Sequence, residues 1–217
     1  MADGLLKFRH CGHEIFARAV PERCPRCGRP AVSSGRLQDA PVAIPSPFVN
    51  GHQASAAFLL RPTQGSFLKD YDGNSDLHVG VTNTTGTVYH YNETGIHRDD
   101  LGWEQCVCVP LIQPSMFGLI NQWDRYLEEC CASEDWLPCR YDEHDHNCYT
   151  FTLTFVNCIL AAQERKQLSK CEFTERFVLP RTRRASKYIS ICKEIAGNNF
   201  YFLDCSDKEE MKSQAAN

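Results

Sequence analysis

Apolar residues fall into short runs in the middle of the chain, and these runs predict strands. The run AAFLLRPT, residues 56–63, suits a strand. Residues 76–83 and 87–92 are rich in β-branched and aromatic side chains and flank a Thr-Thr-Gly turn, which predicts a hairpin. A third strand is expected over 105–112, with the sequence QCVCVPLI.

Later in the chain the apolar spacing changes to that of helices. Between Phe117 and Cys131 apolar residues recur every three or four positions, which predicts an amphipathic helix. Residues 148–162 are apolar on most sides and suit a buried helix, although the threonines and aromatic residues of CYTFTLTFV also permit a strand. A last helix is expected from Ala185 to Ala196, ended by Gly197.

The order of these elements predicts an α+β fold with an appended small module. Three prolines and few apolar residues mark 31–53 as a linker. We therefore expect a zinc-ribbon-like module over 1–30, an α+β domain over 54–205 and a disordered, polar tail over 206–217.

Composition and charge exclude several classes of protein. The chain has 217 residues, of which 42% are hydrophobic, and a net charge of −4, so we expect a globular protein and no nucleic-acid partner. No apolar run approaches the length of a membrane span. An odd number of cysteines, 13, without a secretory signal predicts a reducing compartment, the cytoplasm or the nucleus.

The N-terminal module carries half of a zinc-binding motif. Cys24 and Cys27 stand in a CPxCG sequence, where two thiolates in a tight turn can hold one tetrahedral ion. Cys11 is the one other cysteine before residue 106, so a histidine must supply the fourth ligand. As the four metal ligands we favour Cys11, His13, Cys24 and Cys27, and His10 is the alternative to His13. We expect a structural Zn²⁺ here and no organic cofactor.

A second pair of residues suggests nucleophilic chemistry. Cys148 is expected in the first turn of a helix, where the positive end of the helix dipole favours its thiolate. His78, in the first strand of the predicted hairpin, can act as the general base. His90 and Asn92, on the next strand, are candidates to orient His78. Histidines 144 and 146 are expected in a solvated, charged loop.

The phrase HxG in a hairpin strand, followed by Tyr141 and HNCxxF at a helix start, resembles the PPPDE peptidases, which include the deSUMOylating isopeptidases. The resemblance covers about residues 56–160 and implies a permuted papain-like fold, with Cys148 as the nucleophile and His78 as the general base. The lecithin retinol acyltransferase and NlpC-type groups carry a related pattern.

Three functions stay open at this point. The first is a cysteine hydrolase of amide, isopeptide or thioester bonds, acting on a protein substrate such as a ubiquitin-like conjugate. The second is a catalytically inactive papain-like scaffold that binds a protein partner through its zinc ribbon; the charged residues next to Cys148 favour it. The third is an acyltransferase-like activity. Thiol reactivity separates the first two, because catalysis needs a reactive thiol and binding does not.

Overall fold

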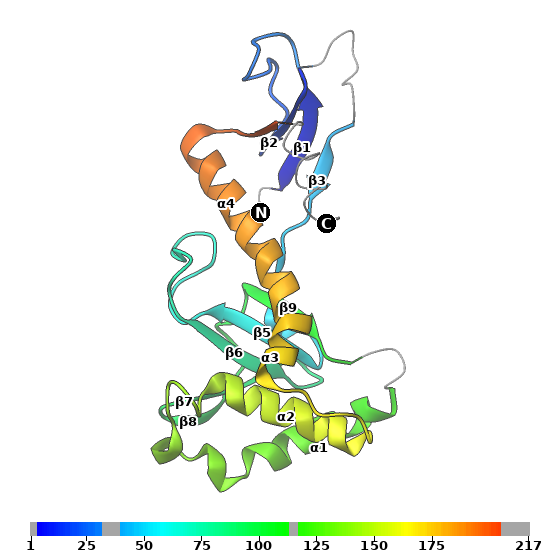
Figure 1. The fold of residues 1–217 in the computed structure, drawn as a ribbon, viewed down its shortest axis with the longest axis vertical. Helices are drawn as coiled ribbons and strands as arrows, with labels where there is room; N and C mark the ends of the chain where they lie inside the picture. The colour runs from blue at the N-terminus through cyan, green and yellow to red at the C-terminus, as the bar shows by residue number, and fades with distance from the viewer. Residues whose placement is uncertain (1–3, 32–39, 113–116, 205–217) are drawn as a thin grey trace. The chain divides into compact units, whose positions relative to one another are not determined.

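The computed structural model describes residues 4–31, 40–112 and 117–204. Contacts divide the chain into two compact units (Figure 1). Unit 1 consists of Met1–Ser46 and Lys187–Asn217, and unit 2 of Pro47–Ser186.

Unit 1 is built on a four-stranded antiparallel sheet. Its strand order is β10 (Tyr201–Asp204), β2 (His13–Ala17), β1 (Leu5–His10) and β3 (Val42–Ile44). Strands β1 and β2 are joined by Cys11 and Gly12, both with positive φ (46° and 80°), which suits the two-residue turn of a right-twisted hairpin. Buried Phe8, Ile15 and Ala17 form its core together with Cys24.

The structure divides the chain differently from the expected boundaries. The 31–53 segment is not linker throughout, because it contains β3, β4 (Phe48–Val49) and the 3₁₀ turn η1 (Gly51–Gln53). Backbone pairing explains the difference: β3 needs few apolar side chains because it adds to the edge of β1. The C-terminal strand β10 pairs with β2, so residues expected in the α+β domain belong to unit 1. The expected tail lies outside the described residues.

Unit 2 contains a six-stranded antiparallel sheet. Its strand order is β4, β9 (Cys106–Pro110), β5 (Ala57–Pro62), β6 (Leu77–Thr82), β7 (Val88–Asn92) and β8 (Gly95–Asp99). The structure confirms the predicted strands around 56–63 and 105–112, and β6 and β7 confirm the hairpin. The edge strand β8, which the pattern did not predict, pairs with β7.

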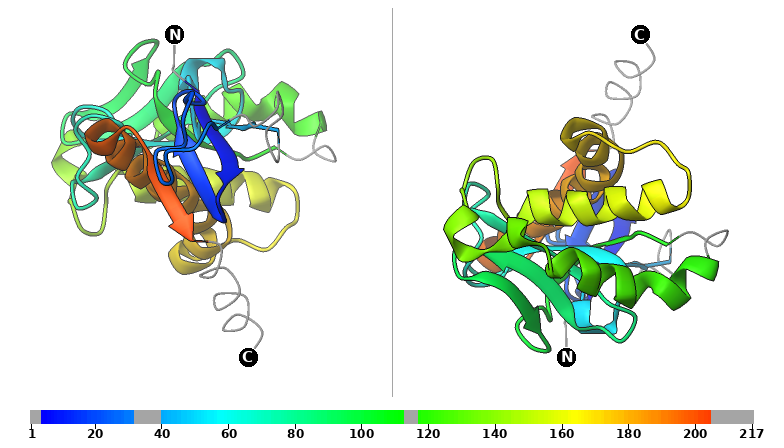
Figure 2. Two further views of the ribbon diagram at one scale, coloured as in Figure 1. Left: turned by 90° about the horizontal axis from the view of Figure 1, so that it is seen from above. Right: turned by 90° about the horizontal axis from the view of Figure 1, so that it is seen from below.

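The two predicted central helices are confirmed as α1 (Phe117–Cys131) and α2 (Cys148–Ala162). They pack against the sheet of unit 2 and against each other (Figures 1 and 2). Fully buried Phe155 of α2 packs edge-on against Trp123 of α1, whose indole donates a hydrogen bond of 2.9 Å to the Thr82 carbonyl. Fully buried Phe151 packs against Trp136 instead. The short 3₁₀ turns η3 (Glu134–Trp136) and η4 (Pro138–Arg140) connect the helices.

The last helical segment is longer than predicted. It runs from 170 to 198 as α3 (Lys170–Phe173), a π-helical turn η5 (Thr174–Val178) and α4 (Leu179–Asn198), which includes the predicted helix from 185 to 196. Within the described ranges, no helix combines the length and apolar character that a bilayer crossing needs. The fold is thus mixed α and β, with two antiparallel sheets.

Candidate functional site

Four potential metal ligands meet at one end of the β1–β2 hairpin in unit 1. Ligand atoms of His10, Cys11, Cys24 and Cys27 all lie within 4.8 Å of one another. The Sγ atoms of Cys11 and Cys24 are 3.8 Å apart, and Cys27 Sγ lies 3.5 Å from His10 Nδ1. Zinc bonds of about 2.3 Å to sulfur and about 2.0 Å to nitrogen, at tetrahedral angles, give separations of roughly 3.8 and 3.5 Å. The group is therefore close enough to hold one metal ion.

The fourth member of this group is His10 rather than the favoured His13. The ring of His13 turns back on its own turn, where Nδ1 lies 2.8 Å from the Cys11 carbonyl. His10 Nε2 instead hydrogen-bonds the Pro30 carbonyl at 3.2 Å. A carbonyl only accepts, so Nε2 carries the proton and Nδ1 is free to bind a metal, as in many metal sites.

The CPxCG segment forms the compact turn that its sequence predicts. Gly28 has φ of +71° and donates its N–H to the Cys24 carbonyl at 2.9 Å, while Cys24 N–H donates to the Arg29 carbonyl at 2.8 Å. The turn directs the two thiols toward one point. Burial, and then contacts with the other two thiols, raise the pKa of Cys11 to about 12, so metal binding must release protons.

In unit 2, a hydrogen-bonded chain of three side chains leads to His78. Asp99 Oδ2 lies 2.7 Å from His90 Nε2, and His90 Nδ1 lies 2.9 Å from His78 Nε2. The Trp103 indole also donates to Asp99 Oδ2, at 3.3 Å. Strands β6 and β7 pair in register only at Val81–Tyr89 and Thr82–Val88, so both histidines lie beyond the paired stretch.

This chain determines which nitrogen of His78 is basic. Burial lowers the pKa of His78 to about 3 and also lowers that of His90, so both rings are neutral near pH 7. Burial opposes ionisation of Asp99, but hydrogen bonds from His90 and Trp103 outweigh it and lower the pKa of the carboxyl. The carboxylate accepts from His90 Nε2, so His90 Nδ1 must accept from His78 Nε2. Nδ1 is therefore the unprotonated nitrogen of His78, the one that would accept a proton.

Cys148 begins α2, as predicted. The side chain of Asn147 caps the helix by accepting hydrogen bonds from the N–H groups of Tyr149 and Thr150. Burial raises the pKa of the Cys148 thiol. Backbone hydrogen bonds lower this pKa, the one with Val79 most strongly, but burial outweighs them. The expected thiolate is therefore not the resting form. Burial, rather than the neighbouring carboxylates, is the main cause.

His78 and Cys148 open into the same pocket, which has a cavity volume of about 720 Å³. Within the described residues no hydrogen bond joins them, and the resting pair is neutral. The Val79 contact nevertheless places the thiol against the residue that follows His78 in β6. Direct transfer of a proton from Sγ to Nδ1 needs the two atoms within hydrogen-bond reach of each other.

Sequence reasoning found part of this arrangement. His90 was one of two candidates to orient His78, and the structure places it there, whereas Asn92 lines the pocket. Asp99 was missed, because it lies in the unpredicted strand β8. Its ligand atom also lies within 4.8 Å of those of His90 and His97. His146 is not in a solvated loop as expected, because its half-buried ring stacks on Trp136 at 4.8 Å.

Comparison with known proteins covers almost the whole chain. The DUF4796 C-terminal domain matches residues 41–195, and the DUF4796 N-terminal domain matches residues 3–30. The chain belongs to the DUF4796 family. This family member is 52% identical over 205 residues to the human MKRN2 opposite strand protein, covering 94% of this chain and 92% of the human one. No solved structure matches this chain.

Proposed function

We propose that this DUF4796 family member is a cysteine hydrolase with a permuted papain-like unit 2, in which Cys148 is the nucleophile and His78 the general base. The observation that carries the proposal is the Asp99–His90–His78 chain, which leaves His78 Nδ1 unprotonated at the pocket that Cys148 also lines. A base held by a second group within hydrogen-bond reach is the arrangement that activates nucleophiles in many hydrolases.

The chemistry follows from the neutral resting pair. As Cys148 Sγ attacks a carbonyl carbon, its proton passes to His78 Nδ1, and the charge on the imidazole is stabilised through His90 by Asp99. The tetrahedral oxyanion forms at the start of α2, where the Cys148 N–H can stabilise it by a few kcal/mol. His78 then protonates the leaving group, and water releases the acyl group from sulfur. Amide, isopeptide and thioester bonds all fit this sequence, and a protein conjugate is the substrate class we infer.

A specific observation favours a second candidate, a scaffold that binds a partner without catalysis. Burial raises the pKa of Cys148, and no hydrogen bond to His78 offsets it within the described residues. A thiol of this kind is a poor nucleophile unless substrate binding brings the base to it. Transfer of an acyl group to an acceptor other than water is a variant of the same chemistry.

Turnover of fluorogenic ubiquitin-like amides and of model thioesters tests the proposal. We expect Cys148→Ala and His78→Ala to abolish turnover, while His90→Asn lowers kcat and preserves folding. The matched control is Cys158→Ala, an exposed cysteine of the same helix, which should keep full activity. Wild-type activity in the His78→Ala protein would rule out the pair.

We also propose that the His10–Cys11–Cys24–Cys27 group holds a structural zinc ion. The support is the donor set, three sulfurs and one imidazole nitrogen, which is typical of structural zinc, together with separations that suit a tetrahedral ion. Zinc would then stabilise the zinc-ribbon-like end of unit 1.

A further inference from the structure

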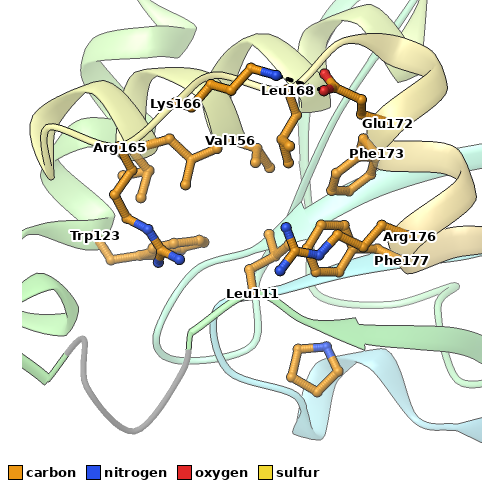
Figure 3. A pocket seen from close by; sticks show the side chains of 13 residues that line it. Leu111, Trp123, Val156, Arg165, Lys166, Leu168, Glu172, Phe173, Arg176 and Phe177 are labelled. Carbon is orange, nitrogen blue, oxygen red and sulfur yellow. Dashed lines mark hydrogen bonds and ion pairs between the residues drawn. The ribbon is translucent and has the colours of Figure 1, made fainter.

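A second pocket lies at the opposite end of α2 from Cys148 and shares no lining residue with the first (Figure 3). Its cavity volume is about 320 Å³, at the lower end of the usual range for small-molecule sites. The wall is mostly apolar and comes from β9, α1, α2, α3 and η5, with Leu111, Trp123, Val156, Ile159, Phe173 and Phe177.

Among the described residues that line the pocket, positively charged side chains outnumber negatively charged ones. Glu172 is the one carboxylate among the described residues that line the pocket, and it pairs with Lys166 at 2.8 Å. Arg165 and Arg176 add two further positive charges to the lining. Their side chains enter from opposite sides, with both guanidinium groups directed toward the space between them (Figure 3). The pocket therefore combines an apolar interior with a positive opening.

The walls are held in place before any ligand binds. The side chain of Asn157 makes two hydrogen bonds to the backbone of Leu168, at 2.8 and 2.9 Å, and so fixes the loop after α2. Ser169 and Glu172 form a capping box that fixes the start of α3. The next turn, Thr174–Val178, is π-helical and carries Arg176 and Phe177. Such turns are rare and often mark functional sites.

We propose that this pocket binds a small carboxylate with an apolar chain, of the fatty-acid class. The apolar interior would bury the chain, and the two guanidinium groups would bind the carboxylate, for which their planar donors are well suited. A preformed site loses less entropy on binding than a flexible one. The proposal is independent of the function proposed for Cys148.

Isothermal titration of the full-length protein with decanoate and decanol, below their aggregation concentrations, tests the site. We expect one saturable decanoate site and binding of decanol weaker by about tenfold or more, since charged hydrogen bonds are lost. The double variant Arg165→Gln/Arg176→Gln should weaken decanoate by a similar factor. The control Arg183→Gln/Arg184→Gln changes two exposed arginines outside the pocket and should bind normally.

Further variants separate this site from the catalytic pocket. Cys148→Ala and His78→Ala should bind decanoate as the wild type does, whereas Val156→Phe, which fills the cavity, should not. Four results would each overturn the proposal: no saturable binding, equal affinity for decanoate and decanol, full affinity in the double arginine variant, or binding of an apolar peptide with a free C-terminus in place of decanoate.

Discussion

Removing one ligand of the proposed zinc site should unfold unit 1 and spare unit 2. Structural zinc contributes roughly 10–16 kcal/mol to small zinc-binding modules, whereas whole domains are stable by only about 5–15 kcal/mol. Unit 1 has a small buried core, and Cys24 belongs to both that core and the ligand group. Changing an outer-shell partner already weakens metal binding by about 10–100-fold, and His10→Asn removes a direct ligand, so its effect should be at least as large.

The structure supplies a matched control and a clean readout for this experiment. His13→Asn removes the other histidine of the hairpin, which stands opposite His10 in the β1–β2 register, and should retain one zinc per chain by elemental analysis. All three tryptophans lie in unit 2, so their fluorescence should stay native while amides of β1 and β2 lose protection from hydrogen exchange. Full zinc content in His10→Asn and loss in His13→Asn would refute the assignment, as would a protein whose unit 1 stays folded after chelation.

Two further predictions concern unit 2. The pKa of His78 is about 3 in the folded protein and about 6.5 in an unfolded chain, so between these values the unfolded state binds more protons. The free energy of unfolding of unit 2 should therefore fall as pH is lowered from 6.5, and His78 should account for up to about 1.4 kcal/mol of this fall per pH unit. Denaturant titrations of wild type and His78→Gln at several pH values check this. Equal slopes of unfolding free energy against pH in the two proteins would contradict it. Phe155→Ala removes a fully buried ring that packs on Trp123 and should cost about 3–5 kcal/mol. A loss under about 1 kcal/mol, measured by the same titrations, would show that this contact does not hold α1 to α2.

The elements that could be predicted are those whose side chains carry a periodic burial pattern. In α1 and α2 the apolar residues alone fix the helix face, and both helices have the predicted bounds. Strand β8 was missed because Gly95–Asp99 contains His97, Arg98 and Asp99, which tolerate water at the edge of a sheet. Its position depends on the turn after Asn92 and on pairing with β7, which no local pattern reveals.

The candidate site was predictable to the extent that its chemistry lies in local motifs. The helix start at Cys148 and the CPxCG turn follow from a cap and a glycine that act within a few residues. The ligand choice between His10 and His13 depends on ring orientation at the hairpin turn, which spacing cannot show. Asp99, the third member of the hydrogen-bonded chain that leads to His78, could not be predicted because its strand, β8, was not predicted. The pocket lined by Arg165 and Arg176 depends on how α2 packs against η5, which local sequence does not show.

The most direct test of the proposed chemistry is the alkylation rate of Cys148, resolved by mass spectrometry between about pH 5 and 9. Cys106 is the internal control, since burial raises its pKa to about 12 and it lies away from the pocket. With His78 as its base, Cys148 should react faster than Cys106, and His78→Ala should remove that advantage while leaving Cys106 unchanged. A Cys148 that reacts no faster than Cys106 at any pH, or that is indifferent to His78→Ala, would contradict a cysteine hydrolase and leave the non-catalytic scaffold.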